Sequence, residues 1–212
     1  IENINTSVNG RATVEAYLAG DAVTALKGAD FVVNAIQVGG YEPSTVIDFE
    51  IPKKYGLRQT IGDTLGIGGI FRGLRTIPVM LQYCKMIEKV APNALLLNYT
   101  NPMAIVTGAI LKATSVRTVG LCHSVQGCAG HLCRELDLPH DNLRWRIAGI
   151  NHQGWLLEIS RNDVDLYPEI KKRAEKEEYR HRDTVRFEIM KRFGYYVTES
   201  SEHSSEYVPW FI

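Results

Sequence analysis

Two residues of the kind that ligate divalent metals follow strand-like segments of this sequence. Cys122, with His123 beside it, comes directly after the apolar residues 116–121, and His152 lies in the segment GINHQGW. By default such a Cys is a small core residue, and such a His is structural. At one edge of a sheet, however, a thiolate and an imidazole could share a metal. They are too few for a closed zinc site, so they predict an open site completed by substrate oxygens and water.

A second group of polar side chains consists of amides and a hydroxyl at strand ends. Asn98, Thr100 and Asn101 lie at the end of the apolar run ALLLNY, in the segment LNYTNPMA. Asn101 is either the N-cap of the following helix or, with Asn98, a hydrogen-bond partner for a sugar or cofactor hydroxyl. Asn34 and Gln37 stand in the equivalent place at the end of the first apolar run.

The glycine-rich segment DTLGIGGIFRG has no known phosphate-binding spacing. No GxGxxG follows the first strand, and the segment lacks the Lys-Ser/Thr ending of a P-loop. It is either a flexible turn before a helix or a helix N-terminus whose free N–H groups favour an anion or a polyol, with Asp63 as an acceptor.

The closing segment VTESSEHSSEYVPWF combines titratable and aromatic side chains. Within nine residues it holds Glu199, Glu202, His203, Glu206 and Tyr207. A solvated loop seldom ends in Tyr-Val-Pro-Trp-Phe, so we expect part of the segment to be buried. Tyr207 has two possible roles, a base with a lowered pKa near a metal or a packing residue with a hydrogen-bonded hydroxyl.

The elements that would position these residues alternate between strands and helices. Residues 31–38, 94–99 and 116–121 are apolar runs typical of parallel strands covered on both faces, and helices are predicted over 77–90 and 103–113. This order predicts a doubly wound α/β sheet with ligands at the carboxyl ends of the strands. After about residue 141, short strand-like stretches precede the charged residues 171–182, which form a solvated helix face or a mobile loop, and a helix from Thr184.

Composition narrows the function classes. The 212 residues carry 24 Lys plus Arg and 24 Asp plus Glu, so the net charge of zero argues against a nucleic-acid binder. Apolar residues make up 45%, but no run is long enough to span a membrane. Four Cys without CxxC spacing indicate a reducing, cytoplasmic setting. The start at Ile1 and the apolar end at Trp210 suggest a piece of a longer protein.

Six segments in order resemble a known family. IQVGGYEPSTVIDFEIPKKYGL, DTLGIGGIFRGLRTIP, LNYTNPMA, VGLCHSVQG, AGINHQGW and TESSEHSSEYVPWF are similar to the NAD-dependent glycoside hydrolases of family 4, most of all to their α-galactosidase branch. The resemblance implies an incomplete Rossmann-type sheet, similar to that of lactate and malate dehydrogenases, in residues 1–123. Residues 124–212 would then begin an α+β substrate and metal domain.

The resemblance also implies a mechanism that departs from two-carboxylate glycosidases. Bound NAD⁺ takes hydride from C3 of the sugar, and a divalent metal, usually Mn²⁺, polarises the ketone. A base removes the C2 proton, the glycosidic oxygen leaves, water adds, and hydride returns to C3. The C2 proton becomes acidic only beside such a carbonyl.

Residue by residue, the resemblance assigns Cys122 and His152 as metal ligands and His123 as the general acid. Asn101 and Asp63 match substrate contacts. The nicotinamide side would be lined by Asn34, Gln37 and Asn98. The candidates for the C2 base are Tyr207, first, and then His203 and Glu206.

Departures from the family pattern bear on substrate and activity. His123 stands where phospho-sugar members carry an acid, and the loop VGGYEPST has no Arg or Lys, so we expect an unphosphorylated α-galactoside. The glycine loop that holds the NAD pyrophosphate is not in the sequence, so we expect this chain by itself to be inactive. Relatives in the family imply a homo-oligomer. The alternatives are a 2-hydroxy acid dehydrogenase of the lactate and malate type and a non-catalytic nucleotide-binding module.

Overall fold

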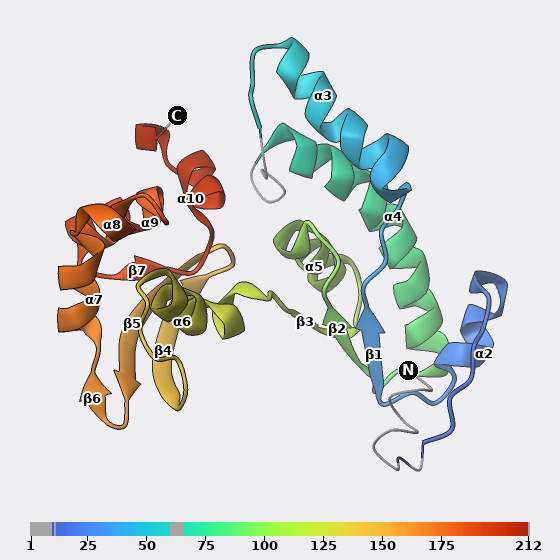
Figure 1. Cartoon of the computed structure of the whole chain (residues 1–212). Coiled ribbons are helices and arrows are strands. Elements are labelled where there is room, and N and C mark those ends of the chain that lie inside the picture. Colours follow the sequence, from blue (N-terminus) through green and yellow to red (C-terminus); the bar gives the residue numbers. More distant parts are fainter. Residues whose placement is uncertain (1–9, 11, 60–65, 212) are drawn as a thin grey trace.

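The chain folds into two parts, each with its own sheet (Figure 1). The computed structural model describes residues 10, 12–59 and 66–211. In chain order the first part contains η1 (Ala19–Asp21), α2 (Ala22–Leu26), β1 (Phe31–Asn34), the helical turn η2 (Gly40–Thr45), α3 (Val46–Lys54), α4 (Ile67–Val90), β2 (Leu95–Asn98), α5 (Met103–Ala113) and β3 (Arg117–Gly120). The second contains α6 (Ser124–Glu135), β4 (Leu143–Ile150), β5 (Gln153–Arg161), β6 (Val164–Asp165), α7 (Tyr167–Ala174), α8 (Glu177–Arg180), α9 (Thr184–Phe193), β7 (Tyr196–Val197), α10 (Ser201–Tyr207) and η3 (Pro209–Phe211).

The first part is a three-stranded parallel sheet in the order β1-β2-β3, which confirms the predicted α/β class. Met80 and Ile87 of α4 and Val106 of α5 pack with Leu96 of β2 in one buried cluster, so both helices cover the same face. Right-handed crossovers place helices on one face whenever the strand order advances without reversal. The carboxyl ends of the three strands therefore meet at one edge, where Asn34, Asn98 and the segment after Gly120 lie.

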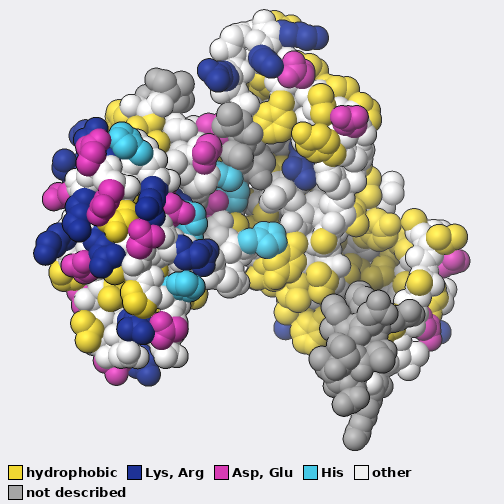
Figure 2. Space-filling model, viewed as in Figure 1, with side chains coloured by type: hydrophobic (Ala, Val, Ile, Leu, Met, Phe, Trp, Pro, Cys, Tyr) yellow, Lys and Arg dark blue, Asp and Glu magenta, His cyan; other side chains and the backbone are white. Residues whose placement is uncertain are grey.

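The opposite face of this sheet differs from the sequence-based expectation. The strands were expected to be buried on both faces, yet Phe31 is 67% and Val33 63% exposed. Figure 2 shows apolar side chains gathered over this part of the molecule, whereas acidic and basic ones are mixed over the second part. Among the described residues, helices cover only one face of the sheet.

Helix α4 begins earlier than the predicted residue 77. Gly66 is its N-cap, so the glycine-rich segment lies at a helix start and in its first turn. A Cβ at Gly68 would lie 2.7 Å from the backbone oxygen of Asp48, so glycine allows α3 and α4 to approach closely. Helix α5 is found where predicted.

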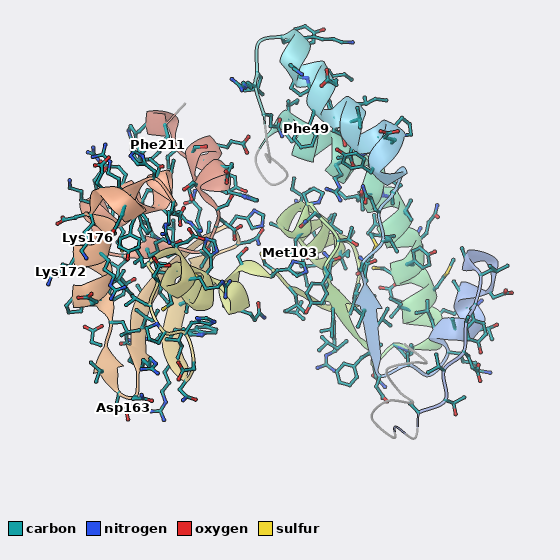
Figure 3. The ribbon with its side chains drawn as sticks, in the orientation of Figure 1. Phe49, Met103, Asp163, Lys172, Lys176 and Phe211 are labelled. Carbon is teal, nitrogen blue, oxygen red and sulfur yellow. The ribbon has the colours of Figure 1, made fainter. Side chains whose placement is uncertain are left out.

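The second part is built on the antiparallel hairpin β4–β5, with β6 and β7 pairing to β5. Sequence analysis did not predict helix α6. Its residue Leu132 and its C-cap residue Leu136 pack with Leu156 of β5 and Ile170 of α7 in a second core. Most of the charged residues 171–182 fall on α7 and α8, which supports the helix-face interpretation over the loop. Lys172 and Lys176 lie at the outer edge of the second part (Figure 3).

None of the described helices combines the length and apolar character needed to cross a membrane. The domain boundary between residues 123 and 124 stays a prediction. It falls in the segment that links β3 to α6.

Candidate metal centre

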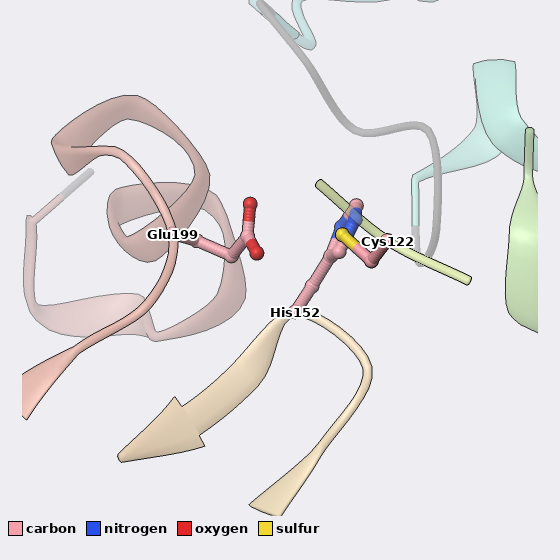
Figure 4. A group of neighbouring side chains, drawn as sticks. All are labelled: Cys122, His152 and Glu199. Atoms are coloured by element: carbon pink, nitrogen blue, oxygen red, sulfur yellow. The ribbon is translucent and has the colours of Figure 1, made fainter. Parts of the chain in front are cut away.

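Three side chains from distant segments converge where the two parts of the chain meet (Figure 4). One ligand atom from each of Cys122, His152 and Glu199 lies within 4.8 Å of the other two. Cys122 follows β3 by two residues, His152 lies on the tight turn between β4 and β5, and Glu199 lies between β7 and α10. The structure thus brings together the two residues predicted to bind a metal and adds a carboxylate.

Cys122 differs chemically from the other cysteines. A hydrogen bond with His152, aided by Ser124, lowers the pKa of the Cys122 thiol below its usual value. Burial instead raises the pKa of Cys84 to about 11 and that of Cys128 to about 12. Because the thiolate is the form that binds metals, Cys122 is the cysteine best prepared to do so.

His152 is held by a tight turn and by the C-terminal helix. It adopts a positive φ of 59° in the two-residue connection of the hairpin and is only 9% exposed. Its Nδ1 atom lies 2.7 Å from the Tyr207 hydroxyl of α10, and its ring stands edge-on to His203 with 5.0 Å between ring centroids. The Nδ1 contact leaves Nε2 as the ring atom for a metal, an arrangement typical of ligating histidines.

Glu199 is the member of the cluster that sequence analysis did not assign as a ligand. Strand β7 pairs with β5 so that Trp155 faces Val197, and Thr198 N–H donates to the Gly154 carbonyl at 3.0 Å. Continued by two residues, this antiparallel register brings Glu199 beside the start of β5 and therefore beside His152. Glu199 is 5% exposed, and its Oε2 lies 3.9 Å from His203 Nε2.

This donor set suits a divalent cation. Sulfur, imidazole nitrogen and carboxylate oxygen are the usual ligands of Zn²⁺ and related ions, and three protein ligands leave room for water or substrate. Next to His152, both polar atoms of the Asn151 amide are buried and have no partner among the described residues. Buried amides normally form hydrogen bonds, so the Asn151 amide also suits a site that holds a further group.

The amides predicted to face a cofactor lie at the edge of the parallel sheet. Asn34 Nδ2 donates to Asn98 Oδ1 at 2.6 Å, and Asn98 Nδ2 donates to Thr107 Oγ1 at 3.0 Å. Asn98 is fully buried and Asn34 is 7% exposed, so this network joins the ends of β1 and β2. Gln37 is exposed and donates to Thr45 Oγ1 at 3.0 Å. A cofactor role for Asn98 stays a prediction, and its geometry favours an indirect one.

The remaining predicted residues occupy different environments. His123 is the exposed N-cap residue of α6, and its ring centroid lies 5.5 Å from that of Tyr99. Asn101 is half-buried before the cis peptide bond to Pro102. Pro102 itself is the N-cap of α5, without a side-chain capping bond, so the N-cap interpretation of Asn101 is wrong. Asp63 lies outside the described residues.

Comparison with known proteins identifies the family. The model described as "Family 4 glycosyl hydrolase" matches residues 1–138, and the model of the "Family 4 glycosyl hydrolase C-terminal domain" matches residues 147–210. An alpha-galactosidase of Bacillus subtilis (strain 168) is 59% identical over an alignment of 213 positions, which covers 100% of this chain and 49% of that protein.

Solved structures agree. A putative glucosidase, lplD, from Bacillus subtilis superposes with a TM-score of 0.75 at 29% identity, over 88% of this chain and 48% of that one. A 6-phospho-alpha-glucosidase from gut microorganisms, solved in complex with NAD and Mn²⁺, superposes with a TM-score of 0.71 at 25% identity. The superposition covers 90% of this chain and 47% of that one. The chain thus spans about half the length of these relatives. With both of its parts matched in order, the chain belongs to the family 4 glycosyl hydrolases.

Proposed function

We propose that this chain carries the metal-binding and sugar-binding portion of an NAD- and Mn²⁺-dependent α-galactosidase. The observation that carries the proposal is the cluster of Cys122, His152 and Glu199 at the junction of the two parts. Support for the galactoside comes from the 59% identity to the Bacillus alpha-galactosidase, and support for the cofactors comes from the relative solved with NAD and Mn²⁺. Both matching models describe family 4 glycosyl hydrolases, which favours this function over a 2-hydroxy acid dehydrogenase.

The chain's own residues would hold the cation and move protons around it. Cys122 and His152 would bind the cation, with Glu199 as a third ligand. When bound, NAD⁺ and the cation supply the hydride acceptor and the Lewis acid for oxidation at C3 of the sugar. In this proposal Tyr207, whose hydroxyl contacts His152 Nδ1, takes the C2 proton, and His123 protonates the departing glycosidic oxygen.

The contact between Tyr207 and His152 gives this assignment a physical reason. If Nε2 of His152 faces the cation, Nδ1 carries the ring proton, and its N–H donates a hydrogen bond to the Tyr207 oxygen. A hydrogen bond donated to a phenolate stabilises the charged form, which helps a tyrosine act as a base. His203, whose ring lies 6.0 Å from that of Tyr207, and Glu206 stay the alternatives for this role.

The neighbourhood of the first strand supports an uncharged sugar. Arg75 of α4 reaches the loop after β1 and donates from Nε to the Val38 carbonyl at 3.1 Å. Its other nitrogens bind both carboxylate oxygens of Asp48, at 3.1 and 2.6 Å. The guanidinium that contacts this loop is therefore already paired with a carboxylate, which disfavours a phosphate at this place. A substrate role for Asn101, a cytoplasmic location and a homo-oligomeric assembly remain part of the proposal.

Metal titration tests whether the cluster of Cys122, His152 and Glu199 binds a cation. We expect calorimetry to show one Mn²⁺ or Co²⁺ bound per wild-type chain, and Cys122→Ser to weaken binding at least a hundredfold. The matched control is Cys133→Ser, because Cys133 is fully buried in the second core, apart from the cluster. Equal affinity of the wild type and Cys122→Ser would overturn the proposed centre. We expect this chain by itself to be inactive, so the substrate is tested in a longer protein that also carries the NAD-binding glycine loop: it should hydrolyse an α-galactoside faster than an α-glucoside and need both NAD⁺ and Mn²⁺.

A further inference from the structure

A buried ion pair lies at the start of α9 and contacts the segment that carries Glu199. Asp183 and Arg186 are each 5% exposed, and Arg186 Nε lies 2.8 Å from Asp183 Oδ2. Taking both charges out of water is unfavourable unless further hydrogen bonds satisfy them. An apolar pair of similar volume would stabilise a core equally well, so the groups that satisfy this pair indicate what it does.

Among the described residues, the side chains of the pair hydrogen-bond, apart from each other, to the segment that carries Glu199. The Tyr196 hydroxyl and the Ser201 hydroxyl both donate to the Asp183 carboxylate, the latter at 2.5 Å. Arg186 donates to the Thr198 carbonyl at 3.4 Å, and its guanidinium lies 4.6 Å from the centre of the Tyr196 ring. Residues 196–201 are thus fixed at both ends and in the middle.

Ser201 anchors the chain on the C-terminal side of Glu199. Its hydroxyl oxygen also accepts a hydrogen bond from Val185 N–H at 3.1 Å. It therefore joins the first turn of α9 to the first residue of α10, two positions after Glu199. On the other side of Glu199, the Thr198 bond to Gly154 fixes the chain to β5.

We infer that Asp183 and Arg186 form a positioning pair that holds Glu199 against Cys122 and His152. This inference rests on the proposed function, because it gives Glu199 a role at the cation. In this inference the pair acts on Glu199 through residues 196–201. Without the pair, the residues between β7 and α10 would be held less tightly. The Glu199 carboxylate would then have a wider range of positions.

A double-mutant cycle on the full chain tests this inference, with Co²⁺ affinity as the readout. The variants are Ser201→Ala, which removes the hydroxyl anchor two positions after Glu199, and Glu199→Gln, which removes the carboxylate charge. We expect Ser201→Ala alone to weaken Co²⁺ binding three- to tenfold. In the Glu199→Gln background the same change should have no further effect, because coupled residues are not additive. Asp183→Asn should behave like Ser201→Ala.

Ser205→Ala is the matched control. Ser205 is on the same helix, and its hydroxyl donates to the Glu202 carbonyl of α10 at 2.7 Å. It should leave Co²⁺ affinity unchanged, and thermal unfolding should confirm that all variants are folded at the titration temperature. A purely structural role for the pair predicts additive effects in the cycle, and additivity overturns the inference. Failure of the wild-type chain to bind Co²⁺ contradicts the proposed metal centre, and the inference with it.

Discussion

The Nδ1 atom of His152 and the hydroxyl of Tyr207 lie 2.7 Å apart, although 55 positions separate the two residues in the chain. The contact joins the β4–β5 turn to α10, and it fixes which ring nitrogen of His152 can face a metal. Outer partners of this kind orient metal-binding histidines and raise their basicity.

Removal of that hydroxyl should weaken metal binding. Tyr207→Phe leaves the His152 Nδ1–H without its oxygen acceptor, so we expect Co²⁺ or Mn²⁺ affinity to fall by about tenfold or more. Calorimetric titration measures the effect. Tyr195→Phe is the control, because Tyr195 contacts the ring of Tyr167 in the second core and should leave the affinity unchanged. Unchanged affinity in Tyr207→Phe would show that His152 does not depend on this contact.

The lowered pKa of Cys122 predicts selective alkylation. A depressed pKa means that the thiolate persists at pH values below those at which ordinary thiols ionise, and is lost only as the pH falls through the lowered value. At neutral pH, iodoacetamide should therefore modify Cys122 first, while Cys84 and Cys128, with pKa values raised to about 11 and about 12, react only on unfolding.

Mass spectrometry of peptides from a pH series checks this order, and added Mn²⁺ should protect Cys122. A Cys122 alkylation rate that keeps rising to pH 9, as for an unperturbed thiol, would contradict the shift. Cys122→Ser provides the blank for the assay.

The sequence predicts the parallel sheet well because each strand is a compact apolar run followed by polar residues. The edge that these strands share was enough to place Cys122 near a functional centre. The prediction that both faces are buried was wrong. Apolar side chains such as Phe31 and Val33 do not indicate whether a helix covers them. Helix α6 was missed because its glycines weaken the helical signal, although Ala129 and Cys133 of its buried face are four residues apart.

Glu199 illustrates what the sequence could not supply. Its place beside His152 follows from the register of β7 on β5, and β7 is only two residues long. So short a strand has no periodic pattern, and the pairing is between segments about 40 positions apart. The burial of Asp183 and Arg186 could not be predicted from the sequence either, because their spacing of three also suits an exposed helical ion pair.

The ion pair between α3 and α4 should matter for stability. Asp48 is 4% exposed and accepts two bonds from Arg75, so Asp48→Ala leaves a half-buried guanidinium without its partner. We expect the free energy of unfolding to fall by about 2–3 kcal/mol in urea titrations. Glu50→Ala, on the same helix, breaks the exposed pair with Lys53 and should cost less than about 1 kcal/mol. Equal losses in the two variants would refute a special role for the buried pair.

Gly149 should be irreplaceable in the hairpin that carries His152. Its φ is +146°, and a Cβ there would lie 2.3 Å from the backbone oxygen of Gln153, a position that backbone atoms cannot vacate cheaply. Gly149→Ala should therefore destabilise the chain by about 3 kcal/mol and shift the His152 turn, so that Co²⁺ affinity falls even where the protein is still folded.

The control for this change is Gly108→Ala. Gly108 lies inside α5 with open space around its missing Cβ, so alanine should stabilise the chain by about 0.5–1 kcal/mol. Urea unfolding and Co²⁺ titration of both variants measure the two effects. If Gly149→Ala binds Co²⁺ as tightly as Gly108→Ala, the turn tolerates a side chain and the position of His152 does not depend on this glycine.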